Sequence, residues 1–195
     1  MIDFLTYYYK KGTEPFLSLS GLPDGEAVPI MEALYREGSV LWERFKDPAQ
    51  YLQARRQTER WLYQEFKTKG GQPQESYPIY MVLGRSMWFL SAADEVTLAT
   101  TAEIQVPLSI FKEGEVSFTY PDSMVSLLLA YHKDPAYYQP EYHGKLFTLS
   151  EIGSIVEANG LPEVGWTTNL PRFLPHYIEA QVWNHQSLLA YKRQL

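Results

Sequence analysis

The sequence predicts an α+β fold, a single domain over residues 1–195 in which N- and C-terminal helices pack on a mostly antiparallel sheet of about four strands. Apolar residues recur with the period of a helix over residues 48–69, and they alternate with polar ones over residues 104–110. No internal repeat, low-complexity segment or linker divides the chain. A chain of this length can bury about 70% of the surface that it exposes when unfolded, so one core suffices.

The N-terminal third is predicted to be helical. Residues 2–10 can form a short helix that ends at a glycine, and a loop rich in proline and glycine follows. A second helix is expected over residues 26–37, with a proline tolerated in its first turn. The longest helix spans residues 48–69, because Asp47 and a following proline form a strong start signal and Lys69-Gly70-Gly71 a stop signal.

The middle of the chain is predicted to form the sheet. Residues 78–83 are a continuous apolar run typical of a buried strand, and a turn leads from them into residues 87–90. Residues 104–110 and 116–120 alternate between apolar and polar side chains, which predicts two strands of a hairpin. Pro107 cannot donate a hydrogen bond to a neighbouring strand, so its strand is expected at an edge of the sheet.

The last third returns to a helical pattern. Residues 123–132 fit a helix or a strand, and a preceding Asp122 together with a later proline favours the helix. Residues 134–147, rich in tyrosine and proline, are expected to be a packed loop. Residues 148–159 begin with the spacing of a capping box and end at a glycine. A final helix is predicted from residue 175 to about residue 193.

Composition argues against several classes of function. The net charge is −6, whereas a general nucleic-acid binder would normally be basic, so no nucleic-acid partner is predicted. The absence of cysteine excludes disulfides and thiol catalysis, and it is compatible with the cytoplasm, where we expect the protein to be located. No apolar stretch has the 18 or more residues of a membrane span, and the N-terminus lacks the pattern of a secretory signal. A soluble protein without a membrane partner is therefore predicted.

Aromatic residues make up 15% of the chain, with 15 tyrosines and 5 tryptophans. Tyrosine combines an apolar ring with a polar hydroxyl, so it lines clefts and interfaces. Tyrosine-rich faces that bury one another would make a homo-oligomer, and a tyrosine-rich boundary of the core is the simpler interpretation.

Arg55 and Glu59 are the strongest candidates for a functional site. They lie one turn apart inside the apolar side of the helix at residues 48–69, where a charge is costly unless it is paired. A guanidinium held by a carboxylate, with Tyr51 and Trp61 as aromatic neighbours, can bind a carboxylate or a phosphate with two parallel hydrogen bonds. The alternatives are a structural ion pair, or an arginine whose stem packs on the apolar surface while its charged head reaches water.

The histidines provide weaker candidates. His143, with the adjacent Tyr142, and His132 flank the tyrosine-rich loop and could supply a general base to a cleft. His176 and Glu179 have the spacing of two metal ligands on one helix face, but a third and a fourth ligand are missing. We therefore predict no metal site and no cofactor.

Two hypotheses about function follow. The first is a non-catalytic binding or interaction protein, whose aromatic-lined cleft near residues 48–69 holds a small anionic ligand or a segment of a protein partner. The second is a hydrolase- or transferase-type enzyme, in which Arg55 holds an anionic group and His143 or His132 acts as acid and base. The sequence leaves open which of them applies, and whether the chain is an enzyme at all.

Overall fold

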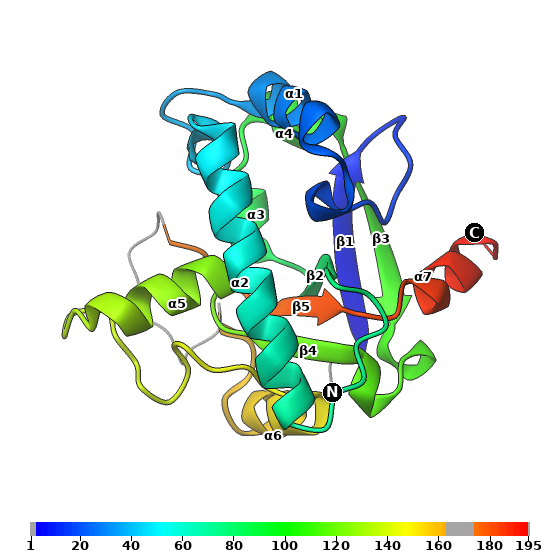
Figure 1. The fold of residues 1–195 in the computed structure, drawn as a ribbon, viewed down its shortest axis with the longest axis vertical. Helices are drawn as coiled ribbons and strands as arrows, with labels where there is room; N and C mark the ends of the chain where they lie inside the picture. The colour runs from blue at the N-terminus through cyan, green and yellow to red at the C-terminus, as the bar shows by residue number, and fades with distance from the viewer. Residues whose placement is uncertain (1–2, 163–173, 195) are drawn as a thin grey trace.

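In the computed structural model, which describes residues 3–162 and 174–194, a long helix lies across one face of a five-stranded antiparallel sheet (Figure 1). The strand order is β3-β1-β2-β5-β4, and all four neighbouring pairs are antiparallel. The strands are β1 (Phe4–Lys10), β2 (Ile79–Leu83), β3 (Thr101–Pro107), β4 (Val116–Thr119) and β5 (Glu179–Val182). This arrangement confirms the α+β prediction, with five strands in place of four.

Seven α-helices and four short 3-10 helices accompany the sheet in the described residues. The α-helices are α1 (Asp24–Leu34), α2 (Pro48–Thr68), α3 (Met87–Ala92), α4 (Glu95–Thr100), α5 (Ser123–His132), α6 (Leu149–Asn159) and α7 (His185–Lys192). The 3-10 helices are η1 (Leu19–Gly21), η2 (Glu43–Phe45), η3 (Leu108–Ile110) and η4 (Glu113–Glu115).

The two faces of the sheet differ in polarity. One face contributes to the main hydrophobic core, which α6 and α7 also enter through Ile152 and Leu188. Its strand residues include Leu5, Met81, Leu83, Val116, Phe118, Ala180 and Val182. Antiparallel partners share a face, so the pairing of Tyr80 with Gln181 and of Thr119 with Glu179 places polar groups together on the other face.

Several sequence predictions are confirmed. Helix α2 begins after Asp47, whose side chain accepts a hydrogen bond from the backbone N–H of Gln50, and it ends before Lys69 as expected. Residues 123–132 are helical, and Thr148 and Glu151 form the expected capping box of α6. Strand β3, which ends at Pro107, lies at an edge of the sheet.

The N-terminal prediction is wrong, because residues 4–10 form strand β1 instead of a helix. This strand lies between β3 and β2 and pairs with β3 along its whole length. Three consecutive tyrosines favour a strand more than a helix. The expected segment at residues 87–90 is likewise not part of the sheet but lies in helix α3.

The predicted hairpin of residues 104–110 and 116–120 is also wrong. Both segments contain strands, but β3 and β4 occupy opposite edges of the sheet. Strand β3 pairs with β1, and β4 pairs with β5. Strand alternation predicts a strand but does not identify its partner, which long-range pairing decides.

The predicted helix at residues 175–193 is in fact strand β5 followed by the shorter helix α7. Because β5 pairs with both β2 and β4, its backbone hydrogen bonds come from two distant segments, which a local pattern does not reveal. His176 and Glu179 therefore do not share a helix face. The proline-rich stretch after Gly160 falls largely at residues 163–173, outside the described residues.

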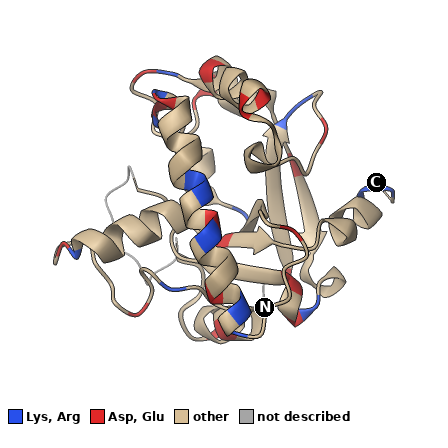
Figure 2. Cartoon of the chain, in the orientation of Figure 1, with Lys and Arg blue, Asp and Glu red and all other residues tan. Residues whose placement is uncertain are grey.

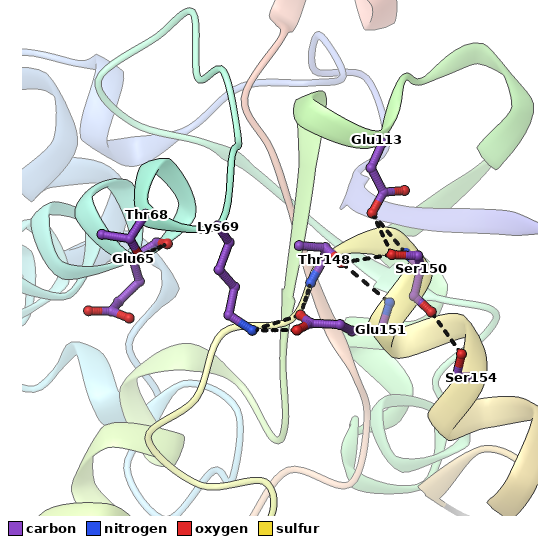
Figure 3. A network of polar contacts seen from close by, with 8 residues as sticks. All are labelled: Glu65, Thr68, Lys69, Glu113, Thr148, Ser150, Glu151 and Ser154. Atoms are coloured by element: carbon purple, nitrogen blue, oxygen red, sulfur yellow. Dashed lines mark hydrogen bonds and ion pairs between the residues drawn. The ribbon is translucent and has the colours of Figure 1, made fainter.

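The C-terminal end of α2 is tied to α6 by a polar network (Figure 3). Lys69 donates to both carboxylate oxygens of Glu151 at 2.7 Å, and Glu151 also accepts from the backbone N–H of Thr148. Glu113 in η4 accepts from the backbone and the side chain of Ser150. All of these side chains are partly exposed, so the network contributes to the position of α2 more than to its stability.

Candidate functional site

A cavity of about 1340 Å³ is the candidate site. Its described lining comes from the first half of α2, from strands β1, β2 and β5, and from parts of α1, η2, α4 and α5. Ligand pockets in proteins commonly have volumes of about 300–1,000 Å³, so the space is sufficient for a small organic molecule. Seven residues of the wall carry charged side chains, and Arg55, Arg44, Asp122 and Glu179 are described below.

The side chain of Arg55 extends from α2 into the cavity, where hydrogen bonds, an ion pair and an aromatic ring hold it. Its Nε donates to the hydroxyl of Ser20 at 3.0 Å and lies 3.3 Å from Oε1 of Glu59. Its guanidinium lies over the ring of Tyr80, 4.2 Å from the ring centre, and its Nη1 contacts the hydroxyl of Tyr51 at 3.4 Å. Arg55 and Glu59 therefore form an ion pair, and these contacts together fix the direction of the guanidinium.

Glu59 is the buried anchor of this network. It is 3% exposed, and its Oε1 accepts hydrogen bonds from Ser20 at 2.6 Å and from the hydroxyl of Tyr80 at 3.1 Å. A buried carboxylate is costly unless it is paired and hydrogen-bonded, and here both conditions are met. Figure 2 shows basic and acidic positions close together in the middle of α2.

Arg44 brings a second guanidinium to the same cavity from η2. Its Nε donates to the backbone carbonyl of Leu41 at 2.7 Å, which holds the side chain against η2. Among the described residues, no acceptor contacts the two terminal nitrogens of Arg44 or the Nη2 atom of Arg55. Guanidinium groups remain charged at every physiological pH, so two positive groups with unused donors face one space.

Two carboxyl groups lie on the cavity wall near the start of α5. Asp122 caps this helix by accepting from the backbone N–H of Val125 at 2.9 Å. Glu179, on β5, accepts from the backbone N–H of Ser123 at 3.1 Å. Burial, and then the charge of Asp122, raise the pKa of Glu179 to about 7. Burial also raises the pKa of Asp122, although the Val125 hydrogen bond and Arg44 oppose this. The pair therefore gains or loses a proton near neutral pH.

A hydrogen-bonded ladder on the polar face of the sheet holds Glu179 in place. The indole N–H of Trp183 donates to Ser117 at 2.9 Å, and Ser117 donates to Oε1 of Gln181 at 2.9 Å. The amide nitrogen of Gln181 donates to Thr119 and to Glu179, both at 2.9 Å. Ser117, Thr119 and Gln181 are fully buried, and such a satisfied network rigidifies the carboxyl group at its end.

The structure brings some of the predicted site residues together and separates others. Tyr51 and Arg55 line the cavity, and Glu59 contacts Arg55 from behind. Trp61 does not belong to the described lining and packs against the cluster of Leu62 and Phe66. His143 and Tyr142 do not belong to it either.

His143 and Tyr142 lie in a separate aromatic cluster around Tyr120. The ring of His143 stacks on Tyr120 with centroids 5.9 Å apart, and Tyr142 meets Tyr120 edge-on at 6.0 Å. His143 is 2% exposed, and burial lowers its pKa to about 4. Its Nδ1 accepts from the backbone N–H of Gln139 at 3.0 Å. A neutral imidazole packed in this way stabilises the loop, and His132 is exposed at the end of α5.

Sequence reasoning missed Arg44, Asp122 and Glu179 as members of the site. The sequence pattern predicts Asp122 only as a helix cap, and it predicts Glu179 on a helix beside His176. One signal was available, since residues 178–183 alternate apolar residues with Glu179, Gln181 and Trp183. Read with a period of two, this pattern predicts a strand that carries a carboxylate on one face.

In the described part of the chain, no three His, Asp or Glu side chains are arranged to hold a metal ion. No helix within residues 3–162 and 174–194 is both long enough and apolar enough to cross a membrane. Comparison with protein families, with curated proteins and with solved structures finds no match for this chain. The arguments about function therefore depend on the cavity itself.

Proposed function

We propose that the cavity binds a small organic anion, whose anionic group is held by Arg55 and Arg44. The observation that carries the proposal is that two guanidinium groups, from α2 and η2, face one cavity with terminal nitrogens unused by the described residues. Guanidinium groups bind carboxylates and phosphates through two parallel hydrogen bonds. An anion between them would supply the acceptors that the protein does not.

Arg36 also lines the cavity, but its Nη1 donates to two backbone carbonyls at 3.0 and 2.6 Å. Arg56, Arg85 and Arg60 do not line it. Arg56 pairs with Asp24 at 2.7 Å and Arg85 with Glu103 at 3.1 Å, both near the surface. Arg60 is exposed on the outer side of α2 and does not line the cavity, whereas Arg44 is also exposed but does line it. Arg55 differs because its side chain is only 15% exposed and stacks on an aromatic ring. Burying a charged arginine costs free energy of folding. A ligand-binding role would explain why the protein keeps one at this position.

An enzymatic role is the second candidate, and the carboxyl pair favours it. Asp122 and Glu179 line the same cavity as the arginines, and a carboxyl group with a pKa of about 7 is suited to proton transfer at neutral pH. The acid and base would then be this pair and not His143 or His132, which do not belong to the described lining. In that case the bound anion would be a substrate.

The test is a thermal-shift and calorimetric titration with phosphate, citrate, AMP and pyrophosphate. A ligand at 100 times its Kd stabilises the fold by about 2.7 kcal/mol, which raises Tm by several degrees. Arg44→Gln is expected to weaken binding by about 10- to 100-fold, since it removes a charge-assisted contact. Arg60→Gln, which removes the same charge from the outer side of α2, is the control and is expected to bind normally.

Arg44 is the better position for this test, because replacing Arg55 by an apolar residue would leave Glu59 buried without its partner. Arg55→Lys keeps the charge and serves as a second variant, with weaker binding expected because lysine lacks the planar fork. Equal affinities for Arg44→Gln and Arg60→Gln, or no response of the wild type to any anion, would contradict the proposal. Conversion of a bound anion, seen by NMR with wild type and absent with Glu179→Gln, would favour the enzyme.

A further inference from the structure

Large apolar side chains are exposed where the cavity opens. Val96 on α4 is 70% exposed, Leu128 on α5 is 51% exposed and Tyr131 on α5 is 82% exposed, and all three belong to the cavity lining. Exposed apolar residues scattered singly over a surface are normal, but those grouped around a binding space indicate what the space receives.

Helix α5 is apolar on more than one side. Leu129 packs into the main core, whereas Met124, Leu127 and Leu128 line the cavity. A helix that is apolar all round is normally buried on every side. Here one side borders an open space, so the contact that would cover it is missing from the described residues.

The charged residues of the lining lie at different depths. The side chain of Arg55 is 15% exposed and that of its partner Glu59 is 4% exposed, whereas Arg44 is an exposed residue. The large apolar residues on α4 and α5 named above are also exposed. The positive charge of Arg55 therefore lies farther from solvent than these apolar residues.

We propose that the ligand is an amphiphile, with a compact anionic head bound by Arg55 and Arg44 and an aliphatic tail that covers the apolar side of α5 and the exposed Val96. The inference rests on the proposed function and specifies its ligand class. We favour a small molecule over a second copy of the chain. The guanidinium of Arg55 lies inside the cavity, where the flat surface of another protein would not reach it.

The experiment measures the affinity of four monoalkyl phosphates, ethyl, butyl, hexyl and octyl, by calorimetry below their micelle concentrations. Each methylene group that leaves water strengthens binding by about fourfold, and by less where it stays partly exposed. We expect affinity to rise steadily from ethyl to hexyl phosphate. Neutral 1-hexanol, which lacks the anionic head, is expected to bind far more weakly than hexyl phosphate.

Leu128→Ser locates the tail, and Leu189→Ser is its matched control. Leu189 is also a helical leucine, 39% exposed on α7 and not part of the described lining. Leu128→Ser is expected to weaken hexyl phosphate by about tenfold and to leave ethyl phosphate unchanged. Leu189→Ser is expected to change neither. Circular dichroism melting curves establish that both variants fold.

The outcomes separate the two proposals. If all four phosphates bind equally and Arg44→Gln weakens them, the ligand is a compact anion, so the amphiphile is excluded and the proposed function stands. If 1-hexanol binds as tightly as hexyl phosphate and Arg44→Gln has no effect, the anion site itself is excluded. Absence of binding by every probe contradicts both. A light-scattering mass of twice 22.6 kDa, with probe binding only after dilution to the monomer, would instead assign the apolar rim to a second copy.

Discussion

The two halves of helix α2 use the same side of the helix in opposite ways. In the second half, Leu62 and Phe66 are fully buried and pack with Trp183 and Leu146. In the first half, Tyr51 and Arg55 face the cavity. These positions follow one another at helical spacing along a single stripe, so one amphipathic pattern supports a filled core at one end and a hollow, charged site at the other.

The two halves of α2 differ in how tightly this side of the helix is packed. Protein interiors are close-packed, and a wall without partner atoms loses the dispersion contacts that a filled core provides. The side of the first half of α2 that faces the cavity, at Tyr51 and Arg55, lacks some of these contacts. Arg55 and Glu59 also place two buried charged groups near the middle of the helix. Departures of this kind from the rules of packing are expected at functional sites. The comparison leads to three predictions about stability.

The largest effect is expected from truncation in the filled half. Phe66→Ala removes a fully buried ring that stacks near Trp183 and lies against Gly71. We expect a loss of about 3–5 kcal/mol, because a closed void forms. Tyr51→Ala in the hollow half is expected to cost less, about 1–2 kcal/mol, since the space that it vacates joins the open cavity. Urea denaturation measures both, and equal losses would contradict the distinction between the two halves.

An intermediate effect on stability is expected from the titration of Glu179, whose carboxyl group lines the cavity. The pKa of Glu179 is about 7 in the folded protein and about 4.5 when unfolded, so the folded state takes up a proton between these values. This stabilisation is complete below about pH 4.5 and is lost as the pH rises through about 7. The total loss is about 3 kcal/mol. Glu179→Gln removes this titration, so its stability relative to wild type should increase over that range.

The difference between variant and wild type is the quantity to measure, because histidines act in the opposite direction. Burial lowers the pKa of His143 and of His185, so both contribute stability that is lost as the pH falls below about 6. They titrate equally in wild type and variant, and their contribution cancels. Glu157→Gln, an exposed position on α6, is the control. If the difference in unfolding free energy between Glu179→Gln and wild type is the same at every pH from 4.5 to 8.5, Glu179 does not titrate in this range.

The smallest effect is expected at the C-terminal end of α2, where the network of Figure 3 is partly exposed. Lys69→Met breaks the ion pair with Glu151, whose partners are 32% and 45% exposed. A loss below about 1 kcal/mol is expected, because water screens such pairs, and it should disappear in 1 M salt. Lys145→Met at another exposed position provides the baseline. A loss above 2 kcal/mol would mean that this network, and not the aromatic core, fixes the second half of α2.

Local signals account for the elements that were predicted correctly. Helix α2 has strong start and stop residues and 21 residues of periodic sequence, and α6 has its capping box. The need for a partner of Arg55 follows from its place on an apolar stripe, and Glu59 supplies it at the next turn. These inferences depend on residues within about four positions of one another.

The local patterns of β1 and β5 are compatible with strands, but they do not identify the neighbouring strands, because the hydrogen bonds come from distant parts of the chain. Strand β5 gains its partners from β2, about 100 residues earlier, and from β4, about 60 residues earlier. The hairpin was wrong for the same reason, since a strand pattern does not select its neighbour. The site depends on these same long-range contacts, because β5 brings Glu179 to Asp122 and to the cavity that Arg44 and Arg55 face.

By itself, the sequence determined the α+β class, the long helix with its caps, and the position of Arg55 and Glu59 one turn apart on an apolar stripe, because each is specified by neighbouring residues. Only the tertiary structure decided the strand order, the cavity and the convergence of Arg44, Arg55, Asp122 and Glu179 from four separate segments. The physical reason is that desolvation and charge proximity, which make such groups chemically distinctive, exist only after distant segments have packed together.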